Sequence, residues 1–215
     1  MPLVAEIAPL SVQLREGTRD EHAMAESEGF IERLLAGRLD VAAYADLAVQ
    51  QLAVYTALEQ ASDRVRDDDR GTGLVFDELT RVPAIERDLA HLYGPGWRDA
   101  CRVLPATEHY VARLHAVAGD LARYAAHAYT RYLGDLSGGQ VVKRMLERHY
   151  GLDGAGLEFY TFPEIPKAKP FKDLYRERLD GLRLDAHETA VAVEEAQTAF
   201  RLNRAVFVEL GAAHR

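Results

Sequence analysis

The chain has 215 residues, enough for one sizeable hydrophobic core, and its single cysteine, Cys101, excludes an internal disulfide and is typical of a reducing compartment. Its formal net charge of -8 argues against nonspecific binding to nucleic acid, which requires a basic surface. Residues 1–10 lack a secretory pattern and no apolar run reaches the roughly 18 residues of a membrane span, so we expect a cytoplasmic protein without a membrane anchor.

Apolar residues recur at helical spacing along almost the whole chain. We expect a helix over 9–35, broken near its middle, and then a long helix capped by Asp40. Further helices are predicted over 74–92, 105–118, 120–149 and 168–183, and the last begins at an Asp185–Glu188 capping box and ends at Gly211. No strand pattern, repeat or polar linker appears. The sequence therefore predicts an all-α fold, a single-domain multi-helix bundle over residues 1–215 with its core at about 10–211.

Two of these helices carry an apolar stripe that identifies the side facing the core. The helix after Asp40 presents Val41, Tyr44, Leu47, Leu52, Tyr55 and Leu58. The last helix presents Val193, Ala196, Phe200, Asn203, Phe207 and Leu210. Asn203 is the single polar residue in the second stripe, and either a buried amide with satisfied hydrogen bonds or a functional role explains it.

A histidine near the N-terminus has a carboxylate one helical turn further on. Leu14, Thr18, His22 and Glu26 follow at four-residue steps, so they lie near one another along one helical face. The pair His22 and Glu26 is either an ordinary exposed ion pair or a metal ligand with the carboxylate that orients its ring. The other histidines show no metal-binding spacing, and we expect them at the surface or at helix ends: His91, His109, His115, His127, His149, His187 and His214.

The predicted helix over 120–149 contains three glycines within residues 132–140 (YLGDLSGGQ). Each glycine in a helix interior costs roughly 1 kcal/mol relative to alanine, so a function should compensate for them. Close helix packing, a hinge, and close approach of a flat ligand to bare backbone are the three candidate uses. Two polar residues in the same stretch, Asp135 and Gln140, favour a ligand site.

The two features together resemble the haem oxygenase family. The resemblance rests on Thr-x-x-x-His-x-x-Ala-Glu over residues 18–26 and on residues 125–140, which are similar to the family's distal-helix signature, and it runs from about residue 10 to 210. It implies a soluble, bacterial-type member in which haem is held between a proximal helix and a kinked distal helix.

The resemblance also implies roles for individual residues. His22 becomes the proximal ligand of the haem iron and Glu26 its hydrogen-bond partner. The backbone of the distal helix lies close over the ring at Gly134, Gly138 and Gly139. Asp135 organises water beside the oxygen-binding side of the haem, and further members of this network are Tyr55, Arg131 and Asn203. Phe200 and Phe207 are either core or pocket wall.

A local cluster of positive charge precedes the last helix, formed by Lys167, Lys169, Lys172, Arg176 and Arg178. Haem carries two propionates, which charge-assisted hydrogen bonds would anchor at the edge of a pocket. The resemblance assigns this contact to Arg15, Tyr129, Lys172 and Arg176. Arg15 stands where related sequences often have lysine, which keeps the charge and changes its geometry. Lys167 and Lys169 are expected on a solvated face.

The resemblance implies an enzyme for which haem is both cofactor and substrate. With O2 and electrons from an external donor, a ferredoxin or a flavoprotein reductase, it would open the macrocycle at the α-meso carbon and release biliverdin, carbon monoxide and ferrous iron. A haem carrier or sensor is the first alternative, which Asp135 disfavours because a carrier needs no proton delivery. The same scaffold with di-iron or thiamin-degrading chemistry is the second, and it would need metal carboxylates or a nucleophilic cysteine, for which Cys101 is poorly placed.

Overall fold

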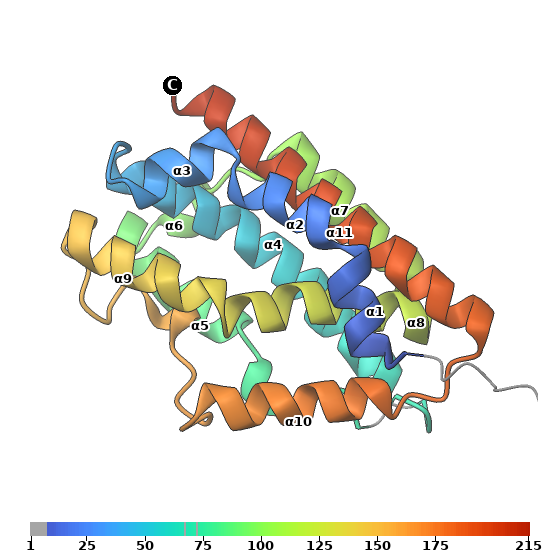
Figure 1. Ribbon diagram of the computed structural model, residues 1–215. Helices are drawn as coiled ribbons and strands as arrows, with labels where there is room; N and C mark the ends of the chain where they lie inside the picture. Colours follow the sequence, from blue (N-terminus) through green and yellow to red (C-terminus); the bar gives the residue numbers. More distant parts are fainter. Residues whose placement is uncertain (1–7, 67, 72) are drawn as a thin grey trace, which may run out of the picture.

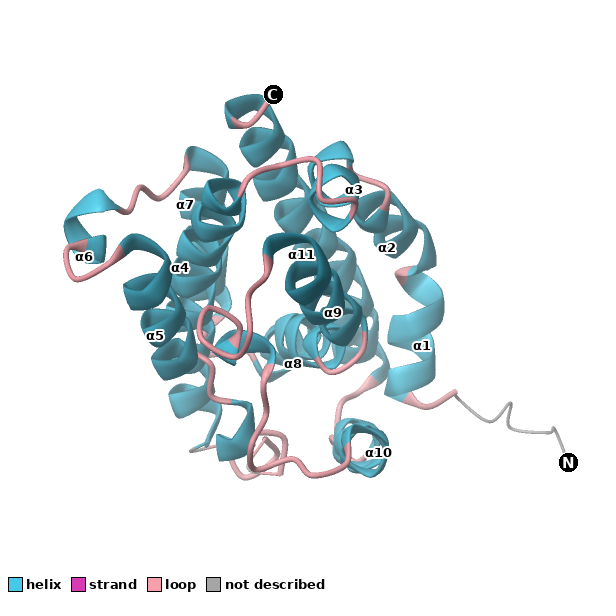
Figure 2. Ribbon diagram, turned by 90° about the vertical axis from the view of Figure 1, so that its left-hand side faces the viewer, coloured by secondary structure: helices cyan, strands magenta, loops and turns pink. Residues whose placement is uncertain are grey.

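The computed structural model describes residues 8–66, 68–71 and 73–215. Within these ranges the secondary structure is helical and no strand occurs (Figures 1 and 2), so the predicted all-α class is confirmed. None of the described helices combines the length and the apolar character that a membrane span requires.

The N-terminal stretch is broken twice, where one break was predicted. It comprises α1 (Leu10–Gly17), α2 (Arg19–Glu26) and α3 (Gly29–Leu35). Thr18 leaves the helical conformation, with φ -111° and ψ 9°, and its buried hydroxyl donates to the Leu14 carbonyl at 2.7 Å. A side chain at Gly17 would begin 2.5 Å from Val193 on the last helix. The glycine therefore lets the bend lie directly against that helix, which places α2 alongside it (Figure 1).

The two longest helices, α4 (Val41–Arg66) and α11 (Ala186–Ala213), begin at the predicted caps. The Asp40 carboxylate accepts from the Ala43 amide at 3.0 Å, and both hydrogen bonds of the Asp185–Glu188 capping box are present. Val41 was wrongly placed on the inner face of α4. It is 44% exposed because it is the first residue of the helix, before the core contacts begin.

The predicted end of α11 at Gly211 is also wrong, because the helix continues to Ala213. Gly211 lies inside the helix, where a side chain would begin 3.5 Å from Phe30 of α3. This glycine serves the packing of α11 against α3 and does not terminate the helix.

The predicted helix over 74–92 begins later than expected. The chain forms the short helix η1 (Asp77–Leu79) and only then α5 (Val82–Tyr93), with a proline in its first turn. The buried guanidinium of Arg81 holds the irregular part through the carbonyls of Leu79, Phe159 and Thr161. The one-turn helix α6 (Trp97–Ala100) was not predicted, whereas α7 (Pro105–Val117) agrees with the prediction within one residue.

The predicted helix over 120–149 is interrupted at its glycines. It divides into α8 (Leu121–Ala128), a π-helical segment η2 (Tyr129–Leu133) and α9 (Gly138–Tyr150). Ser137, with φ -121° and ψ -87°, marks the break. The short helix η3 (Glu158–Tyr160) and α10 (Ala168–Asp180) follow. The local unwinding that the glycines predicted is therefore confirmed.

The core lies where α4, α7, α8 and α11 pack against one another. Four alanines of α8 (Ala122, Ala125, Ala126 and Ala128) are buried, and their small side chains permit a close approach to α11. These four helices form a scaffold. Helices α1, α2 and α3 contact α11, and in the view of Figure 2 α9 lies between α5 on one side and α1 on the other.

Candidate functional site

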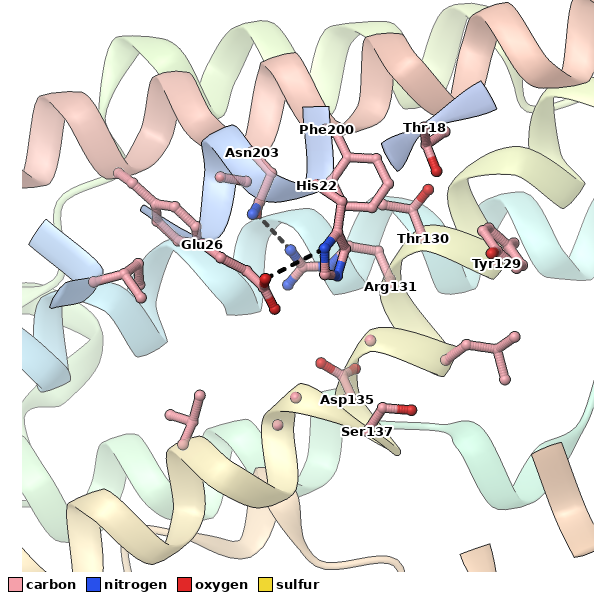
Figure 3. A pocket seen from close by; sticks show the side chains of 18 of the residues that line it. Thr18, His22, Glu26, Tyr129, Thr130, Arg131, Asp135, Ser137, Phe200 and Asn203 are labelled. Atoms are coloured by element: carbon pink, nitrogen blue, oxygen red, sulfur yellow. Dashed lines mark hydrogen bonds and ion pairs between the residues drawn. The ribbon is translucent and has the colours of Figure 1, made fainter. Parts of the chain in front are cut away.

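A pocket with a volume of about 540 Å³ lies between α2 and the segment that runs from η2 into α9 (Figure 3). The scaffold helices form its other walls. Side chains of α4 and α11 contribute an apolar lining through Leu47, Val54, Phe200, Val206 and Phe207. Both phenylalanines left undecided in the sequence, Phe200 and Phe207, are therefore pocket wall.

His22 projects from α2 into this pocket together with Glu26. Its Nδ1 lies 3.4 Å from the Glu26 carboxylate, and its ring packs edge-on against Phe200 with 5.4 Å between ring centroids. A carboxylate at Nδ1 orients the ring and leaves Nε2 as the nitrogen available to a metal. Among the described residues, no three His, Cys, Asp or Glu side chains are grouped to bind a metal ion. A metal at His22 would have to bring its other ligands with it, as iron in a porphyrin does.

Bare backbone of the broken helix lines the pocket on the side away from α2. A Cβ added at Gly134 or Gly138 would meet nothing within 4 Å, and both residues line the pocket. At Gly139 it would meet the Tyr160 ring at 3.3 Å. Helix packing therefore does not explain Gly134 and Gly138, whereas a flat ligand in contact with the backbone does. The glycine surface, the single histidine and the apolar walls together fit a haem.

A π-helical turn places the polar residues of this segment. In η2 the side chain of Tyr132 is buried in the core, whereas Tyr129, Thr130, Arg131 and Leu133 line the pocket. π-helical turns frequently occur at functional sites. Here the turn allows one helix to bury one side and present three consecutive polar residues to a ligand.

A buried carboxylate at the pocket wall is the centre of a polar network. The Tyr55 hydroxyl donates to Asp135, and the Arg131 guanidinium lies 4.9 Å above the centre of the Tyr55 ring. The same guanidinium donates to Asn203 at 2.6 Å (Figure 3). The structure thus brings together the four residues that the family resemblance assigned to one network, namely Asp135, Tyr55, Arg131 and Asn203. Tyr55 itself does not line the pocket, because it lies behind Asp135.

Burial raises the pKa of the Asp135 carboxyl to about 6, although the charge of Arg131 and the hydrogen bond from Tyr55 lower it. The ordinary pKa is 3.8, so the folded protein holds this proton more tightly than the unfolded chain does. The associated stability is complete below about pH 4 and is lost as the pH rises through about 6. Between pH 4 and 7 we expect the apoprotein to lose about 2 kcal/mol relative to Asp135→Asn. Urea unfolding of both proteins across this range measures the difference, and parallel profiles would contradict the assignment.

Positive charge lies at one edge of the pocket. Arg15 of α1, Tyr129 of η2 and Arg176 of α10 line it, as the sequence predicted. Burial raises the pKa of the Tyr129 hydroxyl and the charges of Arg176 and Arg15 lower it, which reflects how near the three groups lie. Lys172 is different: it does not line the pocket, and its Nζ donates to the Ser137 hydroxyl at 3.0 Å.

Several lining residues were not found from the sequence, among them Arg19, Gln51, Ser137 and Tyr160. Of these, only Gln51 could have been predicted, because it precedes Tyr55 by one helical turn and therefore lies on the same face of α4. His127 lies in the last turn of α8, at a helix end as expected for the remaining histidines, but its burial and its partner were not predicted. This residue is fully buried, and its Nε2 lies 2.9 Å from Glu195 of α11. The partner is 68 residues away, so sequence spacing could not indicate it.

The glycine surface leads to a prediction in which stability and ligand affinity change in opposite directions. Gly134 is helical, with φ -61° and ψ -49°, so Gly134→Ala should stabilise the apoprotein by about 0.5–1 kcal/mol. The added methyl group occupies the ligand's space, and we expect haem affinity to fall by at least about tenfold. Gly29→Ala in α3, outside the pocket, is the matched control for the stability gain. Haem titration and thermal unfolding distinguish the two effects, and unchanged haem affinity in Gly134→Ala would refute the close approach.

Comparison with known proteins agrees with this geometry. The family model described as "Heme oxygenase" matches residues 8–209. "Heme oxygenase 1" of Rattus norvegicus is 42% identical over 207 residues, covering 94% of this chain and 72% of the rat protein. "Heme oxygenase 1" of Synechocystis sp. is 38% identical over 202 residues, covering 94% of this chain and 84% of that protein.

Solved structures give the same result. Heme oxygenase-1 of Synechocystis sp., crystallised in complex with heme, superposes with a TM-score of 0.91 at 37% identity, covering 96% of this chain and 94% of that one. The heme oxygenase of Leptospira interrogans superposes with a TM-score of 0.89 at 36% identity, covering 94% of this chain and 100% of that one. The chain belongs to the haem oxygenase family.

Proposed function

We propose that the protein binds haem between His22 and the glycine surface and degrades it with O2 and external electrons to biliverdin, carbon monoxide and ferrous iron. The observation that carries the proposal is the position of His22 across one pocket from Gly134, Gly138 and Asp135. Haem supplies the iron that activates O2 and also the carbon framework that is oxidised. The relatives named heme oxygenase, and the one crystallised with heme, support this reading.

On the proximal side, the chain's own task is to hold one nitrogen ligand in place. The Glu26 carboxylate lies 3.4 Å from Nδ1 of His22 and would orient the ring so that Nε2 is available to the haem iron. Phe200 packs against the same ring and limits its rotation. A neutral imidazole is a weaker electron donor than a thiolate and therefore promotes early cleavage of the O–O bond less strongly. This property of His22 suits oxidation of the haem macrocycle itself.

On the distal side, the task is to supply protons without placing a strong acid against the oxygen. A carboxyl with its pKa at about 6 exchanges protons near neutral pH. Tyr55 orients this carboxyl, and Arg131 with Asn203 extends the polar surface along the pocket. We propose that water held by these groups carries the protons. Close backbone at Gly138 and Gly139 would direct the oxygen to one edge of the ring, for which we propose the α-meso carbon.

The electron donor, the domain organisation and the cellular location are inferred from the sequence together with this function. We propose that the electron donor is a ferredoxin or a flavoprotein reductase and that it docks near the basic edge formed by Arg15, Lys172 and Arg176. The single-domain organisation over residues 1–215 and a cytoplasmic location remain predictions.

The basic edge should contribute unequally to haem binding. Arg176 lines the pocket and Lys172 does not, so Arg176→Met should weaken haem binding about tenfold and Lys172→Met should weaken it less. Arg178→Met, on the same helix outside the pocket, is the charge-matched control. Haem titrations at low and high salt measure the effect, which should shrink as salt rises. Equal losses in all three variants would indicate a general charge effect and no direct propionate contact.

The function itself is tested by following haem in the presence of an electron source. The purified protein is mixed with haemin, ascorbate and catalase are added in air, and the visible spectrum is recorded. Loss of the Soret band with growth of a biliverdin band is the expected result. A stable Soret band with several donors would favour the haem carrier instead.

A further inference from the structure

Gln140 is a polar side chain of the glycine-rich segment that does not line the pocket. It lies in the first turn of α9, directly after the break in the distal helix. Its amide Nε2 donates to two main-chain carbonyls, that of Asp135 at 3.3 Å and that of Tyr160 at 2.9 Å. Both amide protons are therefore used, one on the last helical residue before the unwound turn at residues 136–137 and one on η3.

The segment that accepts the second hydrogen bond is held firmly. Two buried charged residues, neither of which lines the pocket, bind its main chain. The Asp88 carboxylate accepts from the amides of Glu158 and Phe159 at 2.8 Å each. Arg81 donates to the carbonyls of Phe159 and Thr161 at 3.2 and 2.8 Å. Residues 157–161 therefore form a rigid support beneath the distal helix.

The support also contacts the break through Tyr160. Tyr160 is 3% exposed. Its ring packs so closely against Gly139 that a Cβ atom added to the glycine would lie only 3.3 Å from it. Its hydroxyl is hydrogen-bonded by Gln51 of α4. Tyr160 thus joins α4, η3 and the distal helix at one point, and Gln140 ties the Asp135 main chain to that point.

From these contacts we infer that Gln140 is a positioning residue for Asp135, because it fixes the unwound turn of the distal helix to the η3 support. The unwound turn that follows Asp135 has fewer internal hydrogen bonds than a helix, so an external donor is needed to give the Asp135 carboxylate one position. The inference rests on the proposed function for its catalytic consequence. Its structural part, the dependence of the Asp135 environment on Gln140, stands without any ligand.

Gln140→Met tests this role, because methionine matches the length of glutamine and cannot donate a hydrogen bond. Lys143→Met is the matched control: Lys143 ties α9 to the same support through the Thr161 hydroxyl at 2.9 Å but does not contact Asp135. The first readout is the 13C resonance of the Asp135 carboxyl in labelled apoprotein, assigned by its loss in Asp135→Asn. The second is the rate of biliverdin formation at saturating haem, together with the haem dissociation constant.

We expect the Asp135 carboxyl to titrate near pH 6 in the wild type and in Lys143→Met, and closer to 3.8 in Gln140→Met, where the loosened turn exposes it to water. Gln140→Met should also lower kcat about tenfold with haem affinity within about twofold of wild type. Unchanged titration in Gln140→Met, or the same change in Lys143→Met, would overturn the positioning role. If the wild type forms no biliverdin, the proposed function fails, while the titration still decides the role of Gln140.

Discussion

Replacement of His22 by alanine is expected to abolish biliverdin formation while leaving haem uptake in place. The apolar walls and the basic edge still receive the ring, but the described pocket offers no second histidine on the side of α2. The truncated side chain leaves a space of the size of an imidazole, next to Glu26 and Phe200. Added imidazole should therefore enter, bind the iron and restore part of the activity.

The measurement is single-turnover biliverdin formation by His22→Ala with and without imidazole. His109→Ala is the control, since His109 is exposed on α7 outside the pocket. Its rate should equal that of the wild type with and without imidazole. Full activity of His22→Ala in the absence of imidazole would exclude His22 as the ligand.

Replacement of Asp135 by alanine should have the second largest effect. General acid–base groups typically contribute 10²–10⁴-fold in rate, and we expect biliverdin yield to fall at least about tenfold with haem binding retained. Haem should then be consumed without forming biliverdin, because proton delivery to the oxygen is no longer controlled. The removed carboxylate also leaves the buried Tyr55 hydroxyl without its acceptor.

Two companion variants separate these causes. Asp135→Asn keeps the shape and loses the titrating group, so it should resemble Asp135→Ala in yield. Glu147→Gln removes an exposed carboxylate of α9 that does not line the pocket and should behave as wild type. The products are quantified by their visible spectra after extraction. Biliverdin yield at the wild-type level in Asp135→Ala would remove Asp135 from the proton path.

Periodicity and capping signals were sufficient for most of the fold. The caps at Asp40 and Asp185 and the unwinding at the glycines are local effects of neighbouring residues, and all three are confirmed. The errors arise where distant contacts decide. Gly211 continues its helix because Phe30 lies against it. The irregular chain before α5 is held by Arg81, whose acceptors include Phe159 and Thr161 from a much later part of the sequence.

The site shows the same division. Residues grouped by the family resemblance, such as His22, Asp135 and Arg131, converge on one pocket. Lys172 does not, because the break in the distal helix places Ser137 within its reach. The π-helical turn η2 could not be predicted, since its sequence continues the helical pattern of α8 and the change in winding depends on tertiary packing. The buried pair of His127 and Glu195 joins two helices that are far apart in the chain. The spacing of neighbouring residues therefore could not predict it.

The central claim, that this pocket binds haem through His22 and opens the ring, is tested most directly by one spectroscopic experiment. Wild-type protein and His22→Ala are loaded with haemin and followed in air with ascorbate and catalase. We predict that the wild type loses its Soret band as a biliverdin band grows, and that the variant binds haem but forms biliverdin only when imidazole is present. A wild-type Soret band that persists, or equal biliverdin formation by both proteins without imidazole, would contradict the account.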